Sequence, residues 1–311
     1  MTTPTLSIHD RTDAIKSRLR LPAICAPMFL VTGPDMVISA CQAGVVGTFP
    51  ATNARTEDQL VTWLDRISST VTKTDAPWAL NMITHNSYGR FDAELDLVKR
   101  YKPELVITAL GGPHRVTDAV HDYGGLVFAD VNSPKFARKA IEKGADGLVL
   151  ICAGAGGHTG EYAMIPFVEE VRTFFDGPII VGGGIGTGRG IKAVEALGVD
   201  FAYLGTRFLA CQESLINDDY RQMVWDSQME DLITSRAITG ALGNWMRASV
   251  EAAGLTEESM KAVAKIDFSQ DMHAGTKAWK HVWSAGQGVG LVHEPESVAD
   301  VVETLLRQYS T

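Results

Sequence analysis

Short apolar runs alternate with amphipathic stretches along most of the chain. Stretches such as TEDQLVTWLDRI, AELDLVKRY and SPKFARKAIEKG have the spacing of helices, and the last ends in a glycine that is typical of a helix stop. Eight apolar runs do not alternate with polar positions, as expected for strands that are buried on both faces. They are residues 22–27, 45–48, 78–82, 104–108, 126–130, 147–151, 178–182 and 201–205.

Strands of this kind, each followed by a helix, predict a parallel sheet that helices cover. Eight strand–helix units in sequence fit a (β/α)8 TIM barrel, whose functional groups lie on loops at the carboxyl ends of the strands. A doubly wound open sheet is the alternative. The number of strands and the positions of the motifs described below favour the barrel, in the α/β class.

The alternation of apolar runs and amphipathic stretches ends after the eighth strand. Residues 213–275 have a helical pattern and contain no strand-like run, with DDYRQMVWDSQMEDLI and LGNWMRASVEAAG prominent. We therefore expect a barrel made of residues 1–212 and 276–311, with a helical insertion, 213–275, that covers its mouth. The segment SVADVVETLLRQY at the end is expected to be a final outer helix whose apolar face consists of Val298, Val301, Val302, Leu305 and Leu306.

Composition narrows the class of protein. The 311 residues are 45% hydrophobic, which is enough for one large domain or two small ones, and no apolar stretch approaches the ~20 residues of a membrane-spanning helix. The first residues lack the apolar core of a secretory signal, so a cytoplasmic protein is expected. A net charge of -9 argues against bulk binding of nucleic acid. Four scattered cysteines and the absence of short histidine spacings predict buried thiols and no metal site.

Two glycine-containing segments predict a phosphate site. VGGGIGTGRG (181–190) runs from the seventh strand into a helix, and YLGTRF (203–208) ends the eighth strand. The first does not contain GxGxxG in the correct register, but bare amides near a helix start can hold a phosphate. In a barrel the loops after strands seven and eight form the usual phosphate site. Tight turns without a ligand are the alternative.

His158 follows the sixth strand in the sequence CAGAGGHTGEY, residues 152–162. An ordinary surface turn would have a similar composition. However, the adjacent Gly154, Gly156 and Gly157 remove side-chain bulk and let the backbone approach a flat ligand. With an ordinary pKa of about 6.5, the ring can exchange a proton near neutrality. We therefore interpret His158 as a functional residue that faces the ligand held by the phosphate loops.

Three further residues are expected at the same rim. Asn81 ends the third strand, and its amide offers a donor and an acceptor for the polar edge of a heterocycle. Pro27 and Met28 end the first strand, where they could pack against the face of a ring or belong to the core.

Four motifs together resemble the nitronate monooxygenase (2-nitropropane dioxygenase) family. They are GADGLVLICAGAGGHTG, PIIVGGGIGTGRG, AYLGTRFLACQES and WSAGQGVGLV, and the resemblance extends over nearly the whole chain. It implies a TIM barrel that binds FMN and has an inserted helical region. Two positions depart from the family pattern: Gly154 stands where many members have glutamate, and Ile151 where they have a glutamine near the flavin.

The resemblance also implies roles for individual residues. His158 would be the catalytic histidine, and Asn81 and Gly156 would contact the flavin, beside the ring-packing positions Pro27 and Met28. The ribityl phosphate would be bound by the backbone of Gly183, Gly184, Tyr203, Leu204, Gly205 and Thr206.

The activity implied first is oxidation of alkyl nitronates with O2 to carbonyl compounds and nitrite. Similar motifs occur in NAD(P)H-dependent FMN reductases that act on a quinone or an enoyl thioester, which is the second reading. A phosphate-ligand binder without catalysis is the third. The expected partners are a small-molecule substrate and O2, with a second copy of the chain as a candidate homodimer partner.

Overall fold

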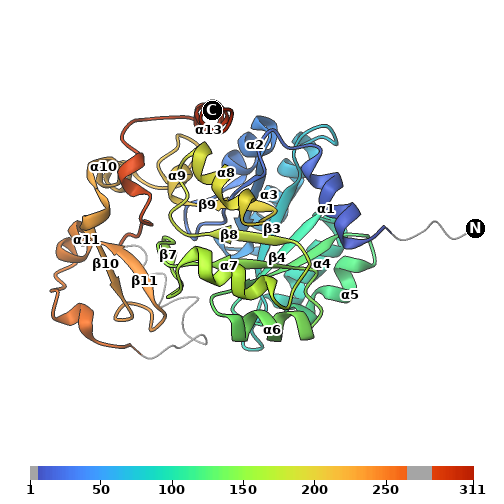
Figure 1. Cartoon of the computed structure of the whole chain (residues 1–311), viewed down its shortest axis with the longest axis horizontal. Helices are drawn as coiled ribbons and strands as arrows, with labels where there is room; N and C mark the ends of the chain where they lie inside the picture. Colours follow the sequence, from blue (N-terminus) through green and yellow to red (C-terminus); the bar gives the residue numbers. More distant parts are fainter. Residues whose placement is uncertain (1–5, 265–281) are drawn as a thin grey trace, which may run out of the picture.

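A closed barrel of eight parallel strands forms the centre of the computed structural model, which describes residues 6–264 and 282–311 (Figure 1). Each strand overlaps one of the eight runs expected from the sequence. Because β1 pairs with both β2 and β9, the sheet closes and the open-sheet alternative is wrong. The strands are β1 (Ala23–Cys25), β2 (Val46–Pro50), β3 (Trp78–Ile83), β4 (Leu105–Ala109), β5 (Leu126–Val131), β6 (Gly147–Ile151), β8 (Ile179–Gly182) and β9 (Phe201–Leu204).

Helices between the strands form the outer layer (Figure 1). Several begin at a serine or threonine whose side chain accepts a hydrogen bond from the first turn, as Thr56, Ser133 and Thr187 do for α3, α6 and α8. The helices of this layer are α2 (Pro34–Ala43), α3 (Glu57–Thr70), α4 (Phe91–Tyr101), α5 (Thr117–His121), α6 (Pro134–Glu142), α7 (Met164–Arg172), α8 (Gly188–Ala196) and α13 (Val298–Tyr309).

The final helix confirms its predicted apolar face. In α13, Val298, Val301, Val302 and Leu305 are buried, and Leu306 packs half-buried beside them. A capping box between Ser297 and Asp300 starts the helix. Because α13 packs on α8 and α2, it completes the outer layer next to the seam where β9 meets β1.

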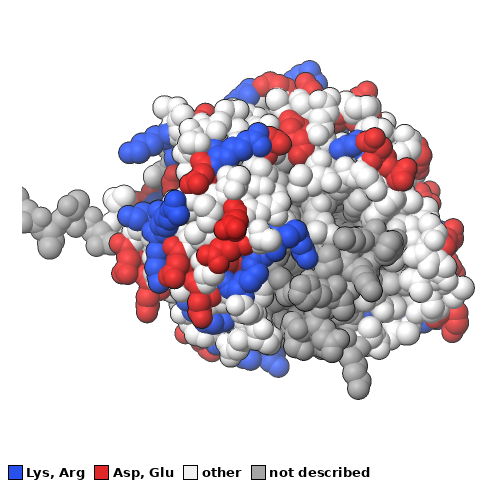
Figure 2. Space-filling model, turned by 180° about the vertical axis from the view of Figure 1, so that it is seen from behind, with Lys and Arg blue, Asp and Glu red and all other residues white. Residues whose placement is uncertain are grey.

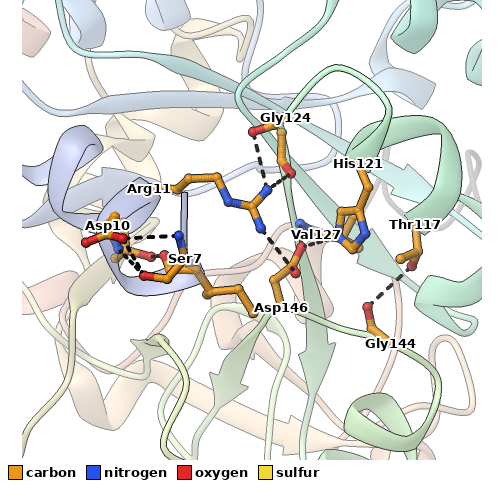
Figure 3. Close-up of polar contacts among 12 residues, drawn as sticks. Ser7, Asp10, Arg11, Thr117, His121, Gly124, Val127, Gly144 and Asp146 are labelled. Atoms are coloured by element: carbon orange, nitrogen blue, oxygen red, sulfur yellow. Dashed lines mark hydrogen bonds and ion pairs between the residues drawn. The ribbon is translucent and has the colours of Figure 1, made fainter. Parts of the chain in front are cut away.

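Helix α1 (Ile8–Lys16) packs at the amino-terminal end of the barrel strands, through ion pairs that Figure 3 shows in part. Asp146, just before β6, accepts the backbone N–H of Val127 at 2.8 Å, pairs with His121 at 2.8 Å and lies 3.9 Å from Arg11. Asp200, just before β9, repeats the pattern with Ile179 and Lys16. These contacts are structural, which leaves the opposite end of the barrel for function.

The stretch after β9 departs from the prediction of helices without strands. Helix α10 (Asp218–Asp226) and the short α11 (Arg247–Ala252) are present, but between them lie β10 (Leu232–Ser235) and β11 (Gly243–Met246). These two strands pair antiparallel, and β11 also pairs with β7 (Gly157–His158) in the loop after β6. Four-residue strands are too short to show a period, and β11 pairs with a segment far away in sequence, so the local pattern did not reveal them. Residues 265–275 of the expected insertion lie outside the described residues.

The surface carries charges of both signs. On the face shown in Figure 2, basic and acidic side chains are interspersed. Exposed ion pairs of the described surface include Arg66–Asp35 and Arg20–Glu303. None of the described helices is both long and apolar enough to cross a membrane.

Candidate active site

The glycine loop after β8 lies at the carboxyl end of the barrel. Gly183 and Gly184 have φ values of 153° and 75°, which side chains rarely adopt. A Cβ at Gly183 would come within 2.9 Å of the Ala153 carbonyl oxygen, so this glycine allows two loops to touch. A Cβ at Gly184 would meet only the Cβ of Gln287, at 3.7 Å, and Gly184 is exposed. The loop therefore presents bare backbone at Gly184.

Unused amides cluster in this loop and at the end of β9. Within residues 6–264 and 282–311, the backbone N–H groups of Gly183, Gly184, Gly205 and Thr206 have no hydrogen-bond acceptor. In contrast, the first amides of α8 are occupied, because Gln308 accepts from Gly188 and Thr187 accepts from Gly190. The unused amides thus lie in the loop before α8 and in the residues after β9, whereas Gly188 and Gly190 in the first turn of α8 have acceptors.

The other residues of the second phosphate segment point in different directions. The Leu204 side chain is fully buried in the core outside the barrel, and its carbonyl oxygen accepts the backbone N–H of Ala26 at 3.0 Å. The Tyr203 side chain belongs to the core inside the barrel. The Tyr203 side chain lies beside the end of β8, 3.2 Å from the position that a Cβ at Gly182 would take, and Thr206 adds a hydroxyl group that accepts from the Gly286 N–H at 2.8 Å.

The loop after β1 lies next to Gly205. A Cβ at Gly205 would be 3.6 Å from the Met28 Sδ, and both Pro27 and Met28 are half-buried. Asn53, which sequence reasoning missed, orders this loop: its amide donates to the carbonyl oxygens of Met28 and Thr32 and accepts from the Leu30 N–H, at 2.8–2.9 Å. Met28 is therefore placed at the rim by a buried amide that no short motif signals.

His158 stands on β7, opposite Gly243 of β11. Its Nε2 lies 3.0 Å from the Thr239 Oγ1, in the turn that joins β10 and β11. The side chain is exposed to solvent, yet the protein around it desolvates the ring and lowers its pKa. With a pKa below its ordinary value of about 6.5, the ring is mostly neutral at pH 7 and can accept a proton.

The hairpin of β10 and β11 holds the loop that carries His158. Asn244, almost fully buried in β11, donates to the Ala155 carbonyl oxygen at 2.8 Å and accepts from the Thr234 hydroxyl at 2.5 Å. The Thr159 N–H donates to the Leu242 carbonyl oxygen at 2.9 Å. The position of His158 thus depends on a segment about 80 residues further along the chain.

The glycines before His158 let the chain pack closely against residues 286 and 287. The Gln287 N–H donates to the Gly154 carbonyl oxygen at 2.9 Å, and a Cβ at Gly154 would lie 2.7 Å from the Gln287 Oε1. A Cβ at Gly156 would lie 2.7 Å from the Gly286 nitrogen. Residues 286 and 287 therefore occupy space that the sequence suggested for a flat ligand. The Gln287 side chain occupies the space in which a side chain at position 154 would lie.

A polar cluster lies inside the barrel at the same end. Asn81 of β3 donates to the Ile107 carbonyl oxygen at 3.3 Å and interacts with Asp130 of β5. Burial raises the pKa of Asp130 to about 7, and the interaction with Asn81 opposes this shift. Tyr203 of β9 is close enough for Asp130 to raise its pKa further. Sequence reasoning identified Asn81 and Tyr203 but missed Asp130, although a carboxylate at the end of the run LVFAD was the available signal.

The cysteines and the possible metal ligands bear on disulfide and metal chemistry. All four cysteines are free and buried. In the described part of the chain, no group of three or more histidine, cysteine, aspartate or glutamate side chains could hold a metal ion. The carboxyl end of the barrel carries unused amides, His158, the carboxyl group of Asp130 and the amide side chain of Asn81. This set can bind an anion, hydrogen-bond a heterocycle and move a proton.

Comparisons with known proteins connect this arrangement to a family. The family model described as nitronate monooxygenase matches residues 78–308. A (3aS,4S,5R,7aS)-5-hydroxy-7a-methyl-1-oxo-octahydro-1H-indene-4-carboxyl-CoA dehydrogenase of Rhodococcus jostii is 30% identical over 222 residues, covering 70% of this chain and 60% of that protein. A nitronate monooxygenase of Pseudomonas aeruginosa is 24% identical over 348 residues, covering 93% and 96%. The match spans less than two thirds of the dehydrogenase's own length.

Among solved structures, the nitroalkane oxidase from Streptomyces ansochromogenes superposes with a TM-score of 0.81. The two chains are 23% identical, and the match covers 96% of this chain and 98% of that one. At this identity the likeness supports the fold alone.

Proposed function

The chain belongs to the nitronate monooxygenase family, and we propose that it is an FMN-dependent oxidoreductase that oxidises alkyl nitronates with O2. Membership in this family makes the chain an oxidoreductase. That its cofactor is FMN and its substrate an alkyl nitronate is our proposal. The observation that carries it is the set of unused amides at Gly183, Gly184, Gly205 and Thr206, at the same end of the barrel as His158.

The residues present fit FMN. The four amides would hold the phosphate, since a fold that leaves N–H groups without acceptors at an open loop provides an anion site. Asn81 would hydrogen-bond the polar edge of the ring, and Met28 would pack beside it. When bound, FMN supplies the electron transfer from the nitronate to O2, with a carbonyl compound and nitrite as products.

His158 would bind and orient the substrate. Its neutral ring can donate a hydrogen bond from one nitrogen to a nitro oxygen, while Thr239 fixes the ring through the Nε2 contact. If the substrate is a neutral nitroalkane, the same ring can take the α-proton, because its lowered pKa keeps it unprotonated at neutral pH. The hairpin beside it, held to the loop by Asn244, would help to keep the ring in place.

A second candidate is an FMN reductase that uses NAD(P)H and acts on a quinone or an enoyl thioester. The similarity to a dehydrogenase whose name specifies a CoA thioester favours it. Both candidates use the same cofactor and the same histidine, so they differ in the electron donor.

An anaerobic mixing experiment separates the two. Purified protein reconstituted with FMN is mixed in separate runs with propyl-2-nitronate and with NADH, and the flavin absorbance is followed. We expect faster bleaching with the nitronate. Rapid bleaching by NADH without consumption of nitronate would favour the reductase. A protein that binds no FMN would refute both candidates.

A further inference from the structure

The polar cluster inside the barrel has groups that the chain leaves unsatisfied. Asp130 Oδ1 and Tyr203 Oη are buried and have no hydrogen-bond partner among the described residues. They project from β5 and β9 into an interior that is otherwise apolar, with Ile107 and Phe128 nearby. Buried polar atoms are normally paired, so a partner from outside the chain is expected at this position.

The carboxyl group of Asp130 can carry a proton, and so donate a hydrogen bond, near neutral pH. Two influences act on it: burial, which raises its pKa to about 7, and Asn81, which opposes that shift. The titratable group that faces it is Tyr203, whose own pKa burial raises well above its ordinary value. Among the described residues, no cation contributes to the pKa of Asp130. With a pKa of about 7, this carboxyl group is protonated in about half of the molecules at pH 7 and in most of them at lower pH.

The position of Asp130 relates it to the cofactor. Parallel strands of a barrel end on one rim, so the carboxyl ends of β3, β5 and β9 lie beneath the loops that present the unused amides. A flavin ring offers several nitrogen and oxygen acceptors to groups below it. An ionised carboxylate could not donate to them, whereas a protonated carboxyl group can.

We propose that Asp130 is a cofactor-site residue whose protonated carboxyl group donates a hydrogen bond to the flavin ring, with Asn81 and Tyr203 as its neighbours. The inference rests on the proposed function, because it requires bound FMN. It adds a proton-bearing group on the barrel side of the cofactor, whereas His158 would serve the substrate.

The affinity of the apoprotein for FMN tests this inference without measuring activity. Flavin fluorescence is titrated between pH 7 and 9, where the phosphate, with a second pKa near ~6, stays a dianion. If FMN binds the protonated form of Asp130, the affinity falls by up to about tenfold per pH unit above the pKa. In Asp130→Asn, whose amide donates at every pH, the affinity should stay flat over the same range.

Glu94 offers a matched control. It is also a buried carboxyl group whose pKa burial raises to about 7, but it lies on α4, outside the barrel, with Tyr88 and Arg90 as partners. Glu94→Gln should keep the pH dependence of the wild type. An equal fall in affinity for wild type and Asp130→Asn would overturn the inference, as would a flat profile in both.

Infrared spectroscopy of the wild type provides a second measurement that does not depend on the variant's folding. FMN binding should shift the carbonyl band of a protonated carboxylic acid, and a band that does not move would contradict a hydrogen bond to the ring. The failure of the proposed function itself is distinguishable, because folded wild-type apoprotein would then bind no FMN at any pH.

Discussion

At the scale of single residues, His158 combines an open face with a desolvated ring. His158→Ala should lower turnover by about 10²–10⁴-fold while FMN stays bound, since the amides at Gly183 and Gly184 are untouched. Because desolvation lowers the pKa of the ring, wild-type activity that needs the neutral form should persist on acidification to its ordinary pKa of about 6.5 and fall only below it. Steady-state kinetics across pH, with flavin content measured in parallel, checks both effects.

His158→Asn separates two roles of the ring. Its amide can still donate a hydrogen bond to a nitro oxygen but cannot take a proton. Turnover of nitronate combined with failure on neutral nitroalkane would assign His158 as a base. If the alanine variant retained flavin and near-normal activity on every substrate, His158 would not be catalytic.

Gly184 provides the second prediction at this scale. Its space is open but its φ is 75°, a conformation that aspartate and asparagine tolerate better than most residues. Gly184→Asp should weaken FMN binding by at least about tenfold, because a carboxylate would repel the phosphate. Gly184→Asn, of similar size and neutral, should retain most of the affinity. Equal binding of FMN by wild type and both variants, measured by fluorescence titration, would place the phosphate elsewhere.

At the scale of elements, the β10–β11 hairpin supports the His158 loop through Asn244. Asn244→Ala removes the hydrogen bond to Ala155 and leaves buried partners unpaired, which should cost about 1–3 kcal/mol of the free energy of unfolding. Turnover should also fall while FMN content stays unchanged, because the loop that carries His158 loses its support. Urea unfolding and steady-state kinetics measure the two effects.

Thr234→Val is the control for this prediction. It removes the hydroxyl that donates to the Asn244 Oδ1 but leaves the bond from Asn244 to Ala155 intact. Its effect on turnover should be smaller than that of Asn244→Ala. If both variants lost stability equally and neither lost turnover, the hairpin would stabilise the fold without positioning His158.

At the scale of the whole molecule, the two ends of the barrel have separate tasks. Asp146 at the amino end joins Val127, His121 and Arg11 (Figure 3). Asp146→Ala leaves these partners without their shared carboxylate and should cost about 3 kcal/mol of the free energy of unfolding. The affinity of the folded variant for FMN should not change.

Arg66→Gln, in an exposed pair with Asp35, is the control and should change stability by no more than about 0.5 kcal/mol. A loss of FMN affinity in Asp146→Ala would show that the two ends are coupled.

The local pattern of the sequence determined the barrel and part of its rim. Each strand was recognisable because parallel strands buried on both faces are continuous apolar runs, and helices such as α13 have a one-sided apolar face. The glycine loop and His158 were recognisable because they directly follow two of these strands. Local order along the chain is enough to place a residue at the end of a barrel strand.

Tertiary structure decided what surrounds those residues. The pairing of β7 with β11, the support from Asn244 and the approach of Gln287 to Gly154 join segments 80 or more residues apart, and no local period records such contacts. Asp130 likewise looks like any aspartate that ends an apolar run, and nothing in the local sequence indicates its raised pKa. Its raised pKa exists because barrel closure brings β3, β5 and β9 together around a half-buried side chain whose Oδ1 is shielded from solvent.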